Sequence, residues 1–379
     1  MDQDKKPLRI LVVDDTVIYR KIVSDVLSEL PDVEVVGTAH NGKAALLKIK
    51  TLKPDLLTLD IEMPEMNGLQ VLQQLHEQAP NVGAVMVSTL THEGGAMTIK
   101  ALELGAFDFI PKPSGGSLAE NRESVKNALA PILKAFARSQ EIRGMLGRSA
   151  LGSRHALKPK VSRLPVSPAA TVTRRSEVSA IVAIGISTGG PLALAHMLPQ
   201  LPADIGVPVV IVQHMPPLFT QSLAKSLDNK CPLHVREAVD GEPLKPNVVY
   251  IAPGGKHMKI AAGPDGKQRI LRITNDAPEN NCKPSADYLF RSVADHYVGR
   301  ATGVIMTGMG ADGNEGLKLM KRNGAVVIAQ DEASCVVFGM PREPIESGTA
   351  DVVAPLGHIA SQILRTVSYN DKRPTAHTN

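Results

Sequence analysis

The strongest constraint on the fold is a repeated alternation of short apolar runs with helix-like stretches along the 379 residues. The N-terminal third contains five such runs, at residues 8–13, 33–39, 55–59, 82–87 and 107–110. Strands that alternate with helices form a parallel sheet that is covered by helices on both faces. We therefore predict an α/β protein with doubly wound sheets. The chain length favours two domains, because a domain typically has about 100–200 residues.

A basic stretch separates two patterned halves. Residues 138–177 carry nine basic and two acidic side chains and no aromatic residue. Such a stretch does not bury enough apolar surface to order itself, so we interpret about residues 147–177 as a basic flexible linker. A solvated tether explains its charge most simply, although contact with an acidic partner or a membrane surface stays open. We expect a first domain at 1–137, a helix end and linker at 138–177, a second domain at 178–366 and a polar tail at 367–379.

Composition excludes several classes of function. Aromatic residues make up 3% of the chain and Trp is absent, which argues against stacking on nucleic acid. A DNA-binding regulator would also need a reading element such as a helix-turn-helix, whereas the C-terminal half alternates strands with helices. We expect no membrane insertion and no signal peptide, because the apolar runs are short. The three cysteines lack the spacing of a disulfide framework or zinc site, so we expect a cytoplasmic protein.

Polar side chains follow the ends of the first-domain strands, namely Asp14 and Asp15, Asp60, Ser88 and Lys112. Ligands of such folds bind beyond the carboxyl ends of the strands, so these groups are expected at one site. Three crowded carboxylates favour a hard divalent cation, most naturally Mg²⁺. Asp60 can then attack a phosphoryl group that Lys112 and Ser88 contact. Helix capping explains one of the two neighbouring aspartates, but not the lysine or the serine.

The same region also contains Met63-Pro64, Asn67-Gly68 and Lys112-Pro113. Over about residues 7–130 the chain resembles a two-component receiver domain, which implies a flavodoxin-like fold. By this resemblance Asp60 is the phosphoacceptor, Ser88 and Lys112 contact the phosphoryl group, and Phe109 is the switch aromatic residue. The Mg²⁺ ligands that the resemblance implies are Asp14, Asp15, Asp60 and the backbone carbonyl of Glu62.

The second domain begins with an apolar run that ends in Gly185-Ile186-Ser187-Thr188-Gly189-Gly190, before a helix-like stretch. The glycines allow a sharp turn that exposes the Ser187 hydroxyl at a helix N-terminus. Alone, this pattern fits a nucleophilic serine and a phosphate-binding loop equally well. His214 and Asp312 each follow a later strand-like run, so a serine, a base and a carboxylate converge on one sheet edge. This convergence favours a catalytic set over a phosphate-binding regulator without catalysis.

Other residues in the sequence offer alternative assignments. In the ordinary α/β-hydrolase order the histidine follows the acid, which would require His358 or His377, but a surface or tail histidine is the simpler interpretation. His257 begins a predicted hairpin, and it either lines the site or is a structural histidine. Cys282 is a weaker candidate nucleophile, because no histidine at an evident strand end is next to it.

Several motifs extend over most of the second domain. They are Ser187-Thr188-Gly189-Gly190, Gln213-His214-Met215-Pro216, Ala252-Pro253-Gly254, Pro284-Ser285-Ala286-Asp287, Thr307-Gly308-Met309-Gly310 with Asp312-Gly313, and Gly339-Met340-Pro341-Arg342-Glu343. Over about residues 178–366 they resemble the catalytic domain of the chemotaxis protein-glutamate methylesterases. The resemblance implies a Rossmann-like esterase domain with a β-hairpin and no cofactor at its active site.

The resemblance also implies a reaction and partners. The reaction is the hydrolysis of γ-glutamyl methyl esters on chemoreceptors, often with deamidation of glutamines, under phosphorylation control. The partners are the cytoplasmic domains of chemoreceptors as substrates and a chemotaxis histidine kinase as phosphodonor. Ser187, His214 and Asp312 occupy the family's catalytic positions. The candidates for oxyanion or substrate contacts are Thr188, Met309, Gly310 and His257.

Overall fold

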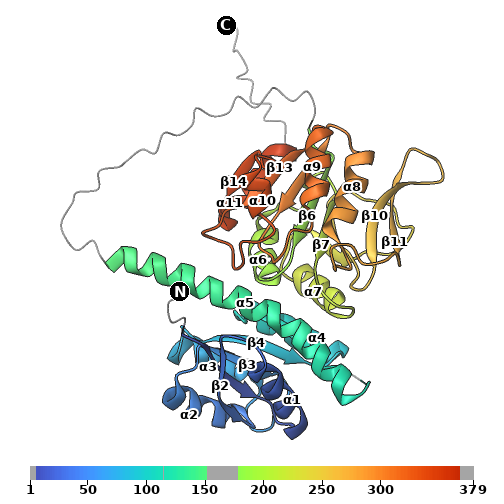
Figure 1. The fold of residues 1–379 in the computed structure, drawn as a ribbon. Helices are drawn as coiled ribbons and strands as arrows, with labels where there is room; N and C mark the ends of the chain where they lie inside the picture. The colour runs from blue at the N-terminus through green and yellow to red at the C-terminus, as the bar shows by residue number, and fades with distance from the viewer. Residues whose placement is uncertain (1–5, 114, 152–177, 368–379) are drawn as a thin grey trace.

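The computed structural model describes residues 6–113, 115–151 and 178–367, which form two α/β domains (Figure 1). The first domain contains a five-stranded parallel sheet in the order β2-β1-β3-β4-β5, which confirms the predicted flavodoxin-like arrangement. Its strands are β1 (Leu8–Val13), β2 (Val33–Ala39), β3 (Leu56–Asp60), β4 (Gly83–Ser88) and β5 (Asp108–Pro111). Its helices are α1 (Val17–Ser28), α2 (Gly42–Leu52), α3 (Gly68–Gln78), α4 (His92–Glu103) and α5 (Leu118–Leu151).

Both faces of this sheet are buried, which explains why its strands are continuous apolar runs. In β1, Ile10 and Val12 pack with side chains of α1 and α5, while Leu11 and Val13 pack with those of α2, α3 and α4. Successive strand residues point to opposite faces, so one run of apolar residues supplies both cores.

Helix α5 is longer than the sequence pattern indicates. It continues to Leu151, beyond Gly147, where we expected the linker to begin. The final turns are rich in good helix formers such as leucine, arginine and alanine, which offset the cost of the glycines. The prediction of a flexible linker for 152–177, and that of a polar tail for 368–379, lies outside the described residues.

The second domain contains a seven-stranded sheet in the order β14-β13-β12-β6-β7-β9-β8, and all of its neighbouring strands are parallel. Its strands are β6 (Ile181–Ile186), β7 (Val209–Gln213), β8 (His234–Glu237), β9 (Val248–Ile251), β12 (Ala301–Ile305), β13 (Val326–Gln330) and β14 (Val352–Ala354). A separate antiparallel hairpin, β10 (His257–Ala262) with β11 (Arg269–Thr274), confirms the predicted hairpin.

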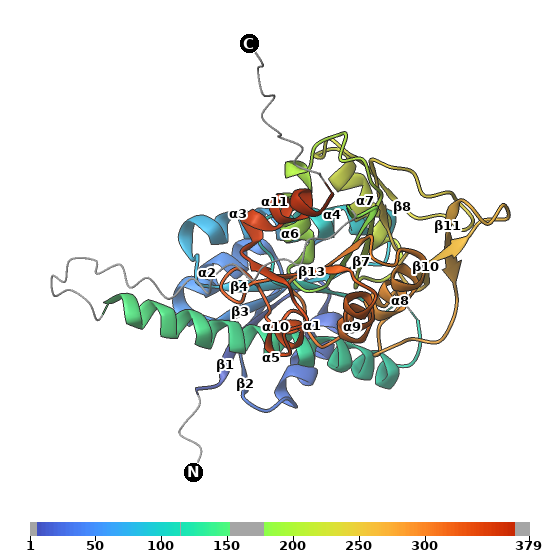
Figure 2. The same ribbon diagram turned by 90° about the horizontal axis from the view of Figure 1, so that it is seen from above.

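Helices cover both faces of the larger sheet (Figure 2). One face carries α6 (Gly190–Met197), a short 3₁₀ turn (Leu198–Gln200), α7 (Phe219–Asp228) and α11 (Leu356–Val367). The other carries α8 (Ala286–His296), α9 (Asn314–Arg322) and α10 (Arg342–Glu346). This arrangement confirms the doubly wound fold. Among the described residues, no helix combines the length and apolar character needed to cross a membrane.

Candidate active site and receiver site

The carboxyl ends of the first-domain strands bring three carboxylates together. Asp14, Asp15 and Asp60 offer oxygen atoms that all lie within 4.8 Å of one another. The Lys112 ammonium lies 2.8 Å from Asp14 Oδ2 and 2.7 Å from Asp60 Oδ2. Burial raises the pKa of Asp60 to about 6, and the neighbouring aspartates act in the same direction while Lys112 opposes them. An all-oxygen donor set of this charge fits a divalent metal ion.

The remaining predicted receiver residues surround this cluster. Ser88 is buried at the end of β4, where its hydroxyl accepts a hydrogen bond from Thr98 Oγ1 at 2.7 Å. Phe109 is buried in β5. Glu62 is exposed in the turn after β3, and the assignment of its carbonyl as a metal ligand stays a prediction.

Ser187 lies in a tight turn between β6 and α6. Its N–H donates to Thr307 O at 3.0 Å, and its carbonyl accepts from Gly190 N–H at 2.7 Å and from Gln213 Nε2 at 3.0 Å. Gly308 packs directly against it, because a Cβ at that position would lie 2.8 Å from Ser187 Cβ. Gly189 has a φ of +79°, a conformation that favours glycine. The turn therefore fixes the serine backbone and leaves its side chain half-buried at the start of a helix.

His214 and Asp312 form the pair that the sequence predicts. His214 Nε2 lies 2.7 Å from Asp312 Oδ2. His214 follows β7, next to β6 in the sheet, and Asp312 follows β12 on the other side of β6. Burial lowers the pKa of His214, but the hydrogen bond to Asp312 and the nearby Cys282 thiol outweigh burial and raise that pKa to about 9.

The Asp312 carboxylate is held by the N-terminus of α8. Its Oδ1 accepts hydrogen bonds from Ser285 Oγ at 2.7 Å and Asn280 Nδ2 at 3.1 Å, and its Oδ2 accepts from Ala286 N–H at 2.6 Å. Burial opposes ionisation, but His214, the Ala286 N–H and the Ser285 hydroxyl lower the pKa of Asp312. Sequence reasoning missed the role of Ser285, although its motif, a serine cap before a helix, is visible in the sequence.

Cys282 lies closer to the site than we expected. Its Sγ is 3.8 Å from His214 Nδ1, the ring nitrogen that does not contact Asp312. The expectation that no histidine stands beside Cys282 is therefore wrong. The loop before α8 folds back onto His214, and strand order alone does not reveal that path. Of the two alternative histidines, the structure describes only His358. It is exposed in α11, whereas Asp312 pairs with His214, and His377 lies outside the described residues.

The four oxyanion or substrate candidates have different environments. Met309 and Gly310 follow Gly308 in the turn that adjoins Ser187, and Thr188 is buried next to Ser187. His257 is not placed to touch a substrate. Its ring is fully buried, its Nε2 lies 3.0 Å from Ala277 O, and its Nδ1 accepts from Ser285 N–H at 3.3 Å. It therefore supports the cap of α8, which is a structural role.

The first domain contacts the second next to Ser187. Asp108 of β5 accepts a hydrogen bond from Thr188 Oγ1 at 2.7 Å. The adjacent Phe109 ring lies 4.5 Å from the ring of Phe219, at the start of α7. Phe109, the predicted switch residue, and its neighbour Asp108 thus contact segments next to two candidate catalytic residues. Thr188 directly follows Ser187, and α7 follows His214.

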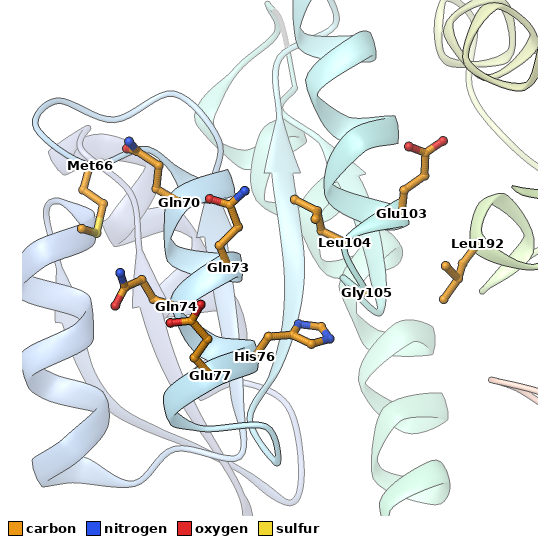
Figure 3. A pocket seen from close by; sticks show the side chains of 10 residues that line it. All are labelled: Met66, Gln70, Gln73, Gln74, His76, Glu77, Glu103, Leu104, Gly105 and Leu192. Carbon is orange, nitrogen blue, oxygen red and sulfur yellow. The ribbon is translucent and has the colours of Figure 1, made fainter. Parts of the chain in front are cut away.

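Helix α4 extends this contact along α6 and α7. Glu103 at its end accepts a hydrogen bond from Ser226 Oγ at 2.7 Å and pairs with Lys230 Nζ at 2.5 Å. Beside this contact, a groove runs between α3, the end of α4 and Leu192 of α6 (Figure 3). The groove lining includes none of the candidate catalytic residues.

Comparison with known proteins matches both halves of the chain. A family model described as response regulator receiver domain matches residues 10–121, and one described as CheB methylesterase matches residues 182–363. A protein-glutamate methylesterase/protein-glutamine glutaminase of Desulfotalea psychrophila is 54% identical over 371 residues, which is 96% of this chain and 99% of the relative. The protein of that description from Bacillus subtilis is 43% identical over 362 residues, which is 95% of this chain and 98% of the relative.

The chain is also similar to a solved structure, the CheB methylesterase catalytic domain of Thermotoga maritima, with 43% sequence identity. The match covers 50% of this chain and 99% of the solved chain, with a TM-score of 0.48. The full-length relatives decide the classification. Because they align over nearly their entire length, the chain belongs to the protein-glutamate methylesterase/protein-glutamine glutaminase family, with a receiver domain in front of a CheB methylesterase domain.

Proposed function

We propose that this chain is a phosphorylation-regulated protein-glutamate methylesterase of chemotaxis, in which Ser187 is the nucleophile. The substrates would be γ-glutamyl methyl esters on the cytoplasmic domains of chemoreceptors, and the names of the relatives support glutamine deamidation as a second activity. The observation that carries the proposal is the His214–Asp312 pair, which lies beyond the carboxyl ends of the two strands that flank β6 and its Ser187 turn.

The proposed chemistry is acyl transfer to serine. Ser187 Oγ attacks the ester carbonyl carbon and gives its proton to His214 Nδ1, while Asp312 holds Nε2 and stabilises the imidazolium. The tetrahedral intermediate collapses and expels methanol, which takes the proton from His214. Water then attacks the acyl-enzyme with His214 as base, and glutamate and free Ser187 are released. For a glutamine substrate the leaving group is ammonia.

The oxyanion would be stabilised by the turn around Ser187. The N-terminus of α6 presents backbone N–H groups and the positive end of the helix dipole there. Thr188 supplies the N–H after the nucleophile, and Met309 and Gly310 directly follow Gly308, which packs against Ser187. These groups act as positioned dipoles, so they need little reorganisation when charge develops.

The receiver would control access to this site. Asp60 would accept a phosphoryl group from a histidine kinase, with Mg²⁺ held by Asp14, Asp15 and Asp60, and the metal would neutralise phosphoryl charge. Ser88 and Lys112 would contact the phosphoryl oxygens. The contacts of Asp108 and Phe109 beside Ser187 and His214 support occlusion of the site by the unphosphorylated receiver, which excludes a bulky receptor helix.

The test of the nucleophile compares three full-length variants with the wild type, after phosphorylation, on a methylated receptor cytoplasmic domain. Ser187→Ala should lower methanol release by several powers of ten, because members of such a unit are each required. Cys282→Ala should keep catalysis, and His358→Ala serves as an exposed histidine control. Methanol release by a folded Ser187→Ala protein at near wild-type rate, together with loss in Cys282→Ala, would reassign the nucleophile to Cys282.

A further inference from the structure

The Cys282 thiol stands beside the proposed catalytic pair and has no part in the proposed chemistry. It is half-buried, and its Sγ lies 3.8 Å from His214 Nδ1. Three side chains meet here and each offers one ligand atom, and these three atoms lie within 4.8 Å of one another: His214, Cys282 and Asp312. Thiolate and imidazole are the two ligands that Zn²⁺ prefers in proteins.

The separation of the two ligand atoms fits one shared zinc ion. Zn–S and Zn–N bonds are about 2.3 Å and 2.0–2.1 Å long, and at a tetrahedral angle they place sulfur and nitrogen about 3.5 Å apart. The observed 3.8 Å corresponds to an angle of about 120° with those bond lengths. A small side-chain adjustment therefore brings Cys282 and His214 into zinc-binding geometry.

Asp312 already holds His214 in the orientation that a metal site needs. Metal-binding histidines generally use one ring nitrogen for the metal and donate the other N–H to a carboxylate or carbonyl. Here Nε2 contacts the Asp312 carboxylate, and Nδ1 is left to face Cys282. Ser285 and Ala286 fix the carboxylate in turn, so the imidazole is oriented before any ion arrives.

We propose that Cys282 and His214 form an inhibitory binding site for Zn²⁺ or another thiophilic divalent cation. The ion binds Sγ, whose proton is released to solvent, and Nδ1, and water completes the coordination. The inhibition rests on the proposed function, because Nδ1 is the atom that would accept the Ser187 proton. The binding itself does not depend on that function, and two protein ligands with open positions make it reversible.

Direct binding is tested with Co²⁺, a spectroscopic substitute for Zn²⁺, on the full-length protein. Excess Mg²⁺ occupies the all-oxygen receiver site, which in any case cannot give a cobalt–thiolate absorption band. We expect that band in the wild type, its loss on addition of Zn²⁺, and its absence in both Cys282→Ser and Cys282→Ala. Cys231→Ser is the matched control, because Cys231 is also half-buried but belongs to no metal-ligating cluster among the described residues. A band of unchanged intensity in both Cys282 variants, or no band in the wild type, would overturn the proposal.

Inhibition is measured on the same proteins as methanol release at increasing Zn²⁺. The zinc concentration for half-inhibition should rise at least ten-fold in the two Cys282 variants and stay unchanged in Cys231→Ser, and a chelator should restore the wild-type rate. Equal sensitivity of wild type and Cys282 variants would refute the inhibitory site. A cobalt–thiolate band in a protein that releases no methanol would instead leave the site intact and contradict the proposed function.

Discussion

Charge reversal at Glu103 tests whether the contact between the domains restrains the esterase. Lysine at this position would remove the hydrogen bond from Ser226 and the ion pair with Lys230, and would place two ammonium groups face to face. The Lys230 side chain is 39% exposed, so solvent screening limits the ion pair to about 0.5–1 kcal/mol. The lost hydrogen bond adds about 1 kcal/mol.

Together these losses weaken the closed arrangement by about 2 kcal/mol. With a ten-fold change for every 1.4 kcal/mol, the open fraction should rise about 30-fold while the closed state dominates. The assay is the initial rate of methanol release by unphosphorylated full-length protein on a methylated receptor cytoplasmic domain. The control is Glu34→Lys, the same substitution in β2, at the sheet edge farthest from β5.

The expected result is a large rise in basal rate for Glu103→Lys, and a smaller gain from phosphorylation because the contact is already weak. Glu34→Lys should behave as the wild type does. Equal basal rates of the two variants would refute the reasoning that this contact limits access. A basal rate below that of the wild type would mean that the receiver supports the active site rather than covering it.

Three further predictions concern single groups. Asp60→Asn should abolish phosphodonor-dependent activation and covalent labelling, because an amide is a poor nucleophile; labelling at another residue would contradict the assignment of Asp60 as the phosphoacceptor. Ser285→Ala should lower kcat about ten-fold with a smaller change in KM, because Asp312 loses one donor worth about 1–1.5 kcal/mol. In the closed state, burial raises the pKa of Asp108 to about 6, whereas in a separated state we expect the usual 3.8. The closed state therefore binds the proton more tightly and is favoured as the pH falls through 6. The ratio of wild-type to Asp108→Asn basal rates should therefore rise between pH 5 and pH 7, and a constant ratio would contradict this linkage.

Much of both sites could be predicted from the sequence, because parallel strands bring their carboxyl ends to one edge. Asp60 and Lys112 are 52 residues apart, yet their side chains meet at 2.7 Å because β3, β4 and β5 lie side by side. The pairing of His214 with Asp312 across 98 residues follows from the same rule. In each case a strand end fixes the backbone position, and the side chain needs only to reach its neighbour.

The rest depends on the tertiary path of loops, which no strand pattern encodes. Cys282 reaches His214 because the segment before α8 returns to the sheet edge, where Ser285 caps the helix and binds Asp312. The sequence predicts that a hairpin starts at His257, but it does not predict that the His257 side chain is buried. That burial depends on the packing of α8, where the Tyr288 ring stacks on the His257 ring with 4.5 Å between the ring centres. The positions of the loop side chains could therefore be found only from the structure, whereas those at strand ends could be predicted from the sequence.

The placement of Asp108 and Phe109 implies that phosphorylation and receptor binding affect each other in the proposed regulation. If phosphorylation favours the separated domains and a receptor helix binds only that state, the two events are linked through one equilibrium. A receptor bound at Ser187 must then stabilise the phosphorylated receiver by the same factor by which phosphorylation strengthens receptor binding. In the proposed regulation, the contacts at Thr188 and Phe219 would be broken once, by whichever partner arrives first, so the second partner would no longer work against them. Receptor substrate and phosphoryl group would therefore cooperate without touching each other.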